Sequence, residues 1–302
     1  MTVQDSATLP RAIAPKQAAA SGTALAALGV ASFSLSFPAT AWSLTGFGPW
    51  SVTGLRGVLA GALAALYLLA AAAPLPKRRH WPALLVVSGG CVLGFPLLTT
   101  LALRTSSTAH SAVVIGVLPL ATAVVSALRT GRRPSRAFWA AALAGAAAVL
   151  VFTLLQSHGR PTLADLYLFV GLVVCAAGYA EGGRLSRDLP GAQVIAWAVL
   201  AALPVMLLTS AFGLATEPVR FGAKALVGLA YVAAVSQFGA FVLWYRGMAA
   251  IGVPRASQLQ LGQPLLTLVW SVLLLGEDLP AAAPVTAAVV LVCIAVTQRA
   301  RA

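Results

Sequence analysis

The chain is a succession of long apolar segments separated by short stretches that hold most of the charged and turn-forming residues. A helix that crosses a bilayer needs about 20 apolar residues, and dividing the sequence at its charges and turns predicts ten such helices. They cover Gly22–Leu44, Trp50–Ala72, Trp81–Leu103, Ser107–Leu128, Ala137–Leu155, Leu166–Gly183, Ala192–Gly213, Ala225–Tyr245, Ser257–Leu275 and Ala281–Thr297. The pattern therefore predicts an all-α membrane protein with ten transmembrane helices.

Lysines and arginines are distributed unevenly over the predicted loops. One side of the bundle carries Arg56, Arg104, Arg160, Arg220 and Lys224, and the other side carries the rest of the 20, in the two terminal segments and in every second loop. Loops rich in Lys and Arg usually stay in the cytoplasm. The sequence thus predicts a multi-pass protein of the cell inner membrane with both termini cytoplasmic. Residues 1–21 lack the features of a signal peptide and are interpreted as a cytoplasmic N-terminal tail.

Composition supports this assignment. The 302 residues are 60% hydrophobic and 9% charged, with a mean hydropathy of +0.91, whereas a soluble domain has about a quarter charged residues. The net charge of +13 is concentrated in short clusters between apolar segments, which fits membrane topology better than a nucleic-acid-binding face. We therefore expect the lipid bilayer, and not a nucleic acid, to be the partner of this surface.

Two helices carry a single proline near their centre, and the two prolines lie about 145 residues apart. Aligning Pro119 with Pro264 divides the chain into two halves of five predicted helices, residues 22–157 and 158–302. Because five is an odd number, the second half would enter the membrane from the opposite side. The sequence thus predicts two inverted repeats, the arrangement in which many transporters hold substrate near the midplane of the membrane.

Local motifs support a family assignment. Three features resemble the EamA type of the drug/metabolite transporter superfamily: a proline within the fourth helix of each half (Leu118-Pro119-Leu120 and Gln263-Pro264-Leu265), a Leu275-Gly276-Glu277 ending of the ninth helix, and Arg56 in the second helix. The first half has no Leu-Gly-Glu, because Leu128-Arg129-Thr130 stands there. The resemblance implies that the ninth helix lines a central cavity. It also implies export of amino acids and related compounds.

Polar side chains recur along single faces of several predicted helices. At 100° per residue, Gln260, Gln263 and Thr267 share one face of the ninth helix, and Gln237 shares a face of the eighth with Phe241 and Trp244. Ser36 and Thr40 share a face of the first helix, and Tyr179 lies in the sixth near a row of small residues. These nine residues are our candidates for substrate binding.

The central prolines, Pro119 and Pro264, are candidates for gating. A proline inside a helix leaves a backbone carbonyl without its usual donor and bends the helix, and in a bundle that carbonyl can face a cavity. A static kink that only shapes the bundle explains either proline equally well.

Each of these patterns also has a structural interpretation. Serines and threonines spaced by four, and the GxxxG pairs such as Gly57 and Gly61, allow helices to pack closely. Tryptophans near helix ends are typical of the membrane interface. Long amides on an apolar helix need partners, so Gln260 and Gln263 favour a cavity more strongly than the hydroxyls do.

Three expectations concern charged side chains. Glu181 lies near Arg184 and Arg187, which favours an interfacial ion pair over a proton-coupling site. Glu277 and Asp278 are expected to cap the end of the ninth helix. Arg56 is expected to extend toward the membrane surface or to bond a backbone carbonyl.

Nothing in the sequence indicates an enzyme. The chain lacks the GxxxxGK loop of ATPases, HExxH and GxSxG, and its three cysteines, Cys91, Cys175 and Cys293, are far apart in sequence. No cofactor and no metal are expected.

The interpretation that best fits is a secondary transporter that exports neutral or aromatic amino acids by alternating access, as YddG-like exporters do, and acts as a monomer or homodimer. A multidrug or nucleoside-type carrier, and a receptor or assembly protein without transport activity, remain open.

Overall fold

The computed structural model describes residues 15–130, 135–156, 160–251, 259–260 and 262–299. In these residues the chain is entirely helical, without a β-strand. The elements are α1 (Pro15–Ser34), α2 (Ser36–Ser43), α3 (Pro49–Ala70), η1 (Arg78–His80), α4 (Trp81–Val87), η2 (Ser88–Gly94), α5 (Phe95–Ala102), α6 (Thr108–Ile115), α7 (Leu118–Thr130), α8 (Arg136–Gln156), α9 (Leu163–Leu185), α10 (Gly191–Thr216), α11 (Ala223–Ala230), η3 (Tyr231–Gly239), α12 (Ala240–Ile251), α14 (Gly262–Leu275) and α15 (Ala282–Arg299).

Consecutive elements join into longer apolar rods. Among the described residues, eight helical segments are long and apolar enough to cross a membrane, and Gly262–Leu275 and Ala282–Val296 are shorter apolar helices. These ten segments correspond to the ten predicted helices, although the last two do not reach spanning length within the described residues. Large apolar side chains remain exposed on the outside of the bundle, for example Leu69, Leu208 and Phe221. Such a surface is compatible with lipid and not with water.

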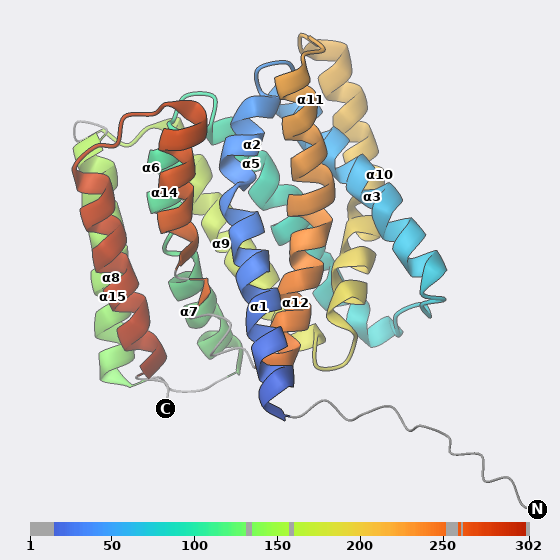
Figure 1. The fold of residues 1–302 in the computed structure, drawn as a ribbon, viewed down its shortest axis with the longest axis horizontal. Helices are drawn as coiled ribbons and strands as arrows, with labels where there is room; N and C mark the ends of the chain where they lie inside the picture. Colours follow the sequence, from blue (N-terminus) through green and yellow to red (C-terminus); the bar gives the residue numbers. More distant parts are fainter. Residues whose placement is uncertain (1–14, 131–134, 157–159, 252–258, 261, 300–302) are drawn as a thin grey trace, which may run out of the picture.

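Helices from the two halves of the chain lie side by side. Helix α3 packs along α10, α1 along α12, and α8 along α15, and Figure 1 shows α8 and α15 as a pair at one edge of the bundle. Each of these pairs takes one helix from each half. Helix α1 begins and α15 ends at the same end of the bundle (Figure 1).

Small residues make the closest of these contacts possible. Gly57 and Gly61 of α3 face Met206 and Leu203 of α10, and an added Cβ at Gly61 would lie 2.8 Å from the Leu203 side chain. Gly90 similarly lies against the backbone of α9. In a bilayer, helices associate largely through such close packing. The structural interpretation of these glycine pairs is confirmed.

The third helix of each half contains a wider helical stretch. Both η2 and η3 are π-helical, and they occupy corresponding places in the rods that run from η1 to α5 and from α11 to α12. A π-helical stretch changes which side chains face a neighbour and often occurs at functional sites. In the second half this stretch contains Ser236 and Gln237, both buried.

Candidate functional site

The fourth helix of the first half is broken near its middle. Helix α6 ends at Ile115, the chain turns at Gly116 and Val117, and α7 begins at Leu118. Pro119 is the second residue of α7, where its missing N–H costs no helical hydrogen bond. The proline therefore starts a half-helix instead of bending a continuous one.

The second half also has a proline near the start of a helix. Helix α14 begins at Gly262, and Pro264 lies in its first turn. The break after α6 meets the start of α14, because a Cβ added at Gly116 would lie 3.3 Å from the Cβ of Pro264. The absence of a side chain at Gly116 thus allows α6 and α14 to approach at the level of their central prolines.

A small cavity lies at this contact. Its volume is about 20 Å³, room for about one water molecule. Its walls combine residues of the first, fourth and ninth predicted helices: Phe37, Ala112, Ile115, Gly116, Leu118, Pro119, Gln260, Gln263, Pro264 and Thr267. Three of the candidate binding residues and both candidate gating prolines share this cavity, and its size means that this conformation is constricted there.

Two glutamines give the cavity its polar character. Gln260 is 5% exposed and Gln263 is partly buried, and neither side chain forms a hydrogen bond with another described residue. Each amide carries two donor hydrogens and an acceptor oxygen. Their hydrogen-bonding capacity is therefore available to a molecule that enters the cavity.

Thr267 has a different role. Its hydroxyl donates to the backbone carbonyl of Ser34, at 2.9 Å. Pro38 lies four residues after Ser34 and has no N–H, so this carbonyl lacks its usual donor. The Ser34 hydroxyl also accepts from the indole N–H of Trp270, at 2.9 Å. Two bonds thus fasten α14 to the first helix at its break between α1 and α2.

A second polar cluster lies on another side of the first helix. The hydroxyls of Ser36 and Ser236 are 2.7 Å apart, and Nη2 of Arg56 donates to the Ser236 hydroxyl at 3.4 Å. Arg56 is 6% exposed. The expectation that it extends toward the membrane surface or bonds a carbonyl is wrong, because α3 packs this side chain inward against η3. Sequence reasoning missed this contact, whose partners are 180 residues apart.

The other two polar candidates do not reach the central cavity. Thr40 is buried and donates to the carbonyl of Ser36, four residues earlier in its own helix, at 2.7 Å. Gln237 is 1% exposed, and neither atom of its amide has a hydrogen-bond partner among the described residues. Gln237 follows Ser236 directly in η3.

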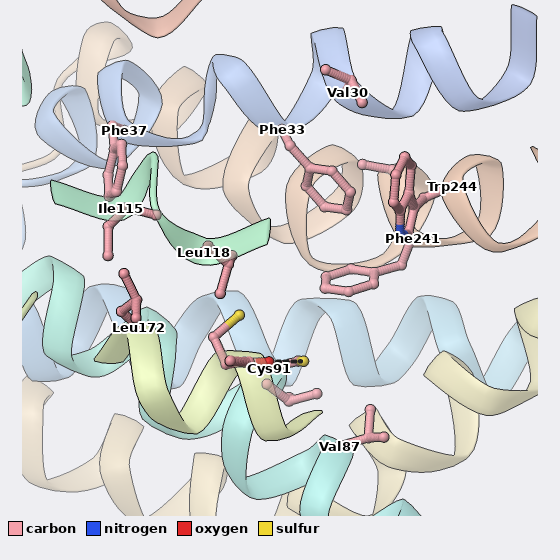
Figure 2. Packing of buried hydrophobic residues seen from close by; sticks show 14 of the residues in the cluster. Val30, Phe33, Phe37, Val87, Cys91, Ile115, Leu118, Leu172, Phe241 and Trp244 are labelled. Atoms are coloured by element: carbon pink, nitrogen blue, oxygen red, sulfur yellow. Dashed lines mark hydrogen bonds between the residues drawn. The ribbon is translucent and has the colours of Figure 1, made fainter. Parts of the chain in front are cut away.

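The aromatic candidates form a packed group. Phe241 contacts Phe33 with ring centroids 4.8 Å apart and Tyr179 with centroids 6.0 Å apart, and the Trp244 backbone lies against Gly29. Figure 2 shows Phe33, Phe241 and Trp244 gathered in one part of the core. These aromatic side chains join α12 to α1 and α9, and none of them lines the central cavity in this conformation.

One end of the bundle, which we name the Glu277 end, is held by two carboxylates of the second half. Glu277 accepts from the backbone N–H groups of Thr108 and Ala109 at 2.8 and 2.9 Å. Glu217 accepts from those of Trp50 and Ser51 at 3.2 and 2.8 Å. Both carboxylates therefore cap the first turn of a helix in the first half.

The expectation that Glu277 caps the ninth helix is confirmed for its backbone, whose N–H donates to the Ser271 carbonyl at 3.1 Å, whereas its carboxylate caps α6. The residue follows that helix, but a carboxylate is stabilised by the free N–H groups and positive dipole of a helix start, and the start of α6 is within reach.

A cleft of about 480 Å³ opens at the same end, lined by Leu44, Thr45, Gly46, Phe47, Gly48, Pro49, Leu103, Arg104, Glu217, Pro218 and Arg220.

Ion pairs occupy the opposite end and the flank of α9. Glu181 contacts Arg184 at 2.8 Å and Arg129 of α7 at 2.6 Å. The expected ion pair of Glu181 is therefore present, with Arg129 rather than Arg187 as its second partner.

Near the Glu277 end, His110 lies 2.7 Å from Asp165 and stacks on Phe152. These contacts indicate a structural role for this histidine.

A bundle of apolar helices in which two proline-started half-helices meet at a small polar cavity has the architecture of a membrane transporter. The sequence profile of the EamA-like transporter family matches residues 20–154 and, a second time, residues 162–298. The chain therefore belongs to the EamA-like transporter family of the drug/metabolite transporter superfamily, and it consists of two repeats. This confirms the resemblance found in the sequence.

Two known proteins illustrate the relationship. The uncharacterized transporter YdeK of Bacillus subtilis (strain 168) is 43% identical over 272 residues, which are 90% of this chain and 95% of YdeK. The crystal structure of another protein shares the fold. Its TM-score is 0.64 and its sequence identity is 22%, and the match covers 92% of this chain and 98% of that one.

Proposed function

We propose that this protein is a secondary transporter that exports small metabolites, above all neutral or aromatic amino acids, by alternating access. The observation that carries the proposal is the pair of glutamine amides, Gln260 and Gln263, which have no hydrogen-bond partner among the described residues and lie beside the start of α14. In an apolar environment such amides require partners. A zwitterionic solute supplies donors and acceptors without adding a net charge.

The proposed frame is a pair of inverted five-helix repeats, residues 22–157 and 158–302, that together span the membrane ten times. Figure 1 supports the inversion, since α1 and α9 start at opposite ends of the bundle. The twofold profile match divides the chain near the same position. Clustering of arginines at one end supports an inner-membrane location with both termini cytoplasmic, and residues 1–21 as a tail.

Transport follows from the constriction at the central cavity. Pro119 and Pro264 start half-helices that meet there, so a change in their relative orientation would widen the cavity from about one water molecule to the size of a solute. Phe37, Ile115 and Leu118 are large apolar side chains in the cavity wall. They would close it again behind the solute.

The test is uptake of radiolabelled solutes into vesicles that contain the purified protein, with and without a proton gradient. A panel of neutral and aromatic amino acids, nucleosides and cationic drugs tests the substrate class. We expect amino-acid uptake above that of empty vesicles. Uptake of only nucleosides or only drugs would replace the amino-acid assignment, and uptake of no solute would overturn transport.

Variants locate the site. Gln260→Ala and Gln263→Ala should each raise the KM for the transported solute about tenfold, because each removes hydrogen bonds to it. Gln193→Ala is the matched control, since Gln193 lies in the first turn of α10 and outside the cavity. Normal uptake by both cavity variants would exclude this cavity as the site.

A further inference from the structure

Arg56 is a buried cation in the interior of the helical bundle. It lies two turns into α3 and is 6% exposed. Its only hydrogen bond in the described part of the chain runs from Nη2 to the Ser236 hydroxyl, and Nε has no partner. None of the described carboxylates lies within ion-pair distance of it. The guanidinium is therefore buried without a counter-charge.

Such a group is costly in this place. A guanidinium has five N–H donors and does not lose its proton in proteins, and a charge buried without a partner inside a membrane protein is strongly unfavourable. A hydroxyl 3.4 Å away offsets little of this cost. An anion that reached the guanidinium would supply both the missing acceptors and the missing charge.

The neighbours of Arg56 suit an anion. The Ser36 and Ser236 hydroxyls lie 2.7 Å apart, so that a small rotation of either can direct an O–H toward an oxygen atom. The Gln237 amide, next in the chain, is 1% exposed with both polar atoms unpartnered. Three elements, α2, α3 and η3, thus bring the Ser36, Arg56 and Ser236 donors to one buried point.

The composition of the cluster favours a carboxylate. One guanidinium neutralises one negative charge, and its planar fork matches the two oxygens of a carboxylate. A phosphate group at neutral pH carries up to two charges. The cluster contains a single cation, which leaves a phosphate incompletely neutralised.

We propose that Arg56, with Ser36 and Ser236, binds the carboxylate of the transported metabolite. This inference rests on the proposed function, and it assigns one chemical group of the solute to one side chain. Ser36 of the cluster and Phe37 of the cavity wall are consecutive residues of α2. Helix α2 therefore contacts both places, and its movement can join them.

The test compares ligands that share a phenyl ring and differ in charge. Purified wild-type protein, Arg56→Gln and Arg56→Lys are heated with phenylalanine, 3-phenylpropionate (carboxylate only), phenethylamine (amine only) or acetate, at constant ionic strength. The carboxylate-bearing probes should raise the Tm of the wild type and phenethylamine should not. Arg56→Gln should lose this rise, and Arg56→Lys should bind at least about tenfold more weakly, because the fork is lost.

A second readout separates binding from a structural role. Without ligand, Arg56→Gln should have a Tm equal to or above that of the wild type, because it removes an uncompensated charge; a structural arginine would give a lower Tm. Arg104→Gln is the control, since Arg104 is exposed and lies in the cleft at the Glu277 end. It should retain the full carboxylate response.

Each outcome is decisive. If carboxylates raise the Tm of wild type and Arg56→Gln equally, the carboxylate binds elsewhere, for example at the helix starts beside the cavity, and the inference is overturned. It is also overturned if no carboxylate raises the Tm of the wild type. Transport that treats phenylalanine and phenethylamine alike would leave the proposed transport intact and remove the role of Arg56. If the carboxylate response depends on Arg56 but the protein transports no solute, the carboxylate site stands and the proposed transport fails.

Discussion

The Thr267 hydroxyl and the Ser34 carbonyl form a hydrogen bond of 2.9 Å between residues 233 positions apart. The Ser34 carbonyl has no helical donor because Pro38 lacks an N–H. The Thr267 hydroxyl is near because α14 packs against the first helix. Proline and hydroxyl act as one unit that joins the first helix to the ninth, at the side of the central cavity. Several measurable consequences follow from contacts of this kind.

Removing the hydroxyl should destabilise the protein. Thr267→Val keeps the shape of the side chain but leaves a buried carbonyl without a donor, at a cost of about 1–2 kcal/mol. We expect the Tm of the purified protein to fall by a few degrees, and Thr267→Ser to restore most of the loss. Thr216→Val is the control, because that hydroxyl is exposed and bonds its own helix. An unchanged Tm for Thr267→Val would show that the bond contributes nothing.

Restoring the backbone donor should make Thr267 less important. In Pro38→Ala, the new N–H at position 38 can bond the Ser34 carbonyl as in an ordinary helix. The further loss of Tm caused by Thr267→Val should therefore be smaller in the Pro38→Ala background than in the wild type. A double-mutant cycle measures this coupling, and additive effects would contradict the proposed link.

The contact at Gly116 should tolerate no large side chain. A Cβ at this position already lies 3.3 Å from Pro264, so Gly116→Leu would push α6 and α14 apart or distort both, at a cost of about 1–3 kcal/mol. Vesicle transport should fall sharply while Gly116→Ala retains part of it. Gly183→Leu is the control, because nothing lies within 4 Å of a Cβ there. Equal transport by the two leucine variants would argue against a tight crossing.

Loss of the Glu277 cap should lower stability. Glu277→Ala removes two charge-assisted bonds to the start of α6 and should cost about 1 kcal/mol, measured as a fall in Tm. Asp278→Ala is the adjacent control, since this exposed carboxylate has no hydrogen bond or ion pair with the described residues. If both variants melt at the same temperature as the wild type, the cap has no energetic role.

Much of the fold could be predicted because a membrane restricts what a sequence can do. Apolar length marks the helices, and Pro119 and Pro264 mark the places where helical hydrogen bonding must be interrupted. Gln260, Gln263 and Thr267 share one face by helical periodicity alone, and the structure brings all three to the same cavity. These inferences need only local spacing.

The remaining features depend on which helices are neighbours, and local spacing does not contain that information. Phe241 and Trp244 share a face with Gln237, but that face meets α1 and α9 in the packed core. The sequence predicts that Arg56 reaches the membrane surface, because local spacing gives no sign of its partner Ser236, 180 positions later. The Glu277 carboxylate caps a helix other than the one it follows for the same reason.

The two capping carboxylates also make the contacts between the repeats stronger at one end of the bundle than at the other. Glu217 and Glu277 both tie the second repeat to helix starts of the first at one end, whereas Glu181 at the other end meets arginines that are 64% and 53% exposed and so contribute less. At about 1 kcal/mol each, the two caps would favour closure of the Glu277 end about thirtyfold. Both caps would therefore have to be released before the two repeats could separate at the Glu277 end, where the cleft beside Glu217 lies.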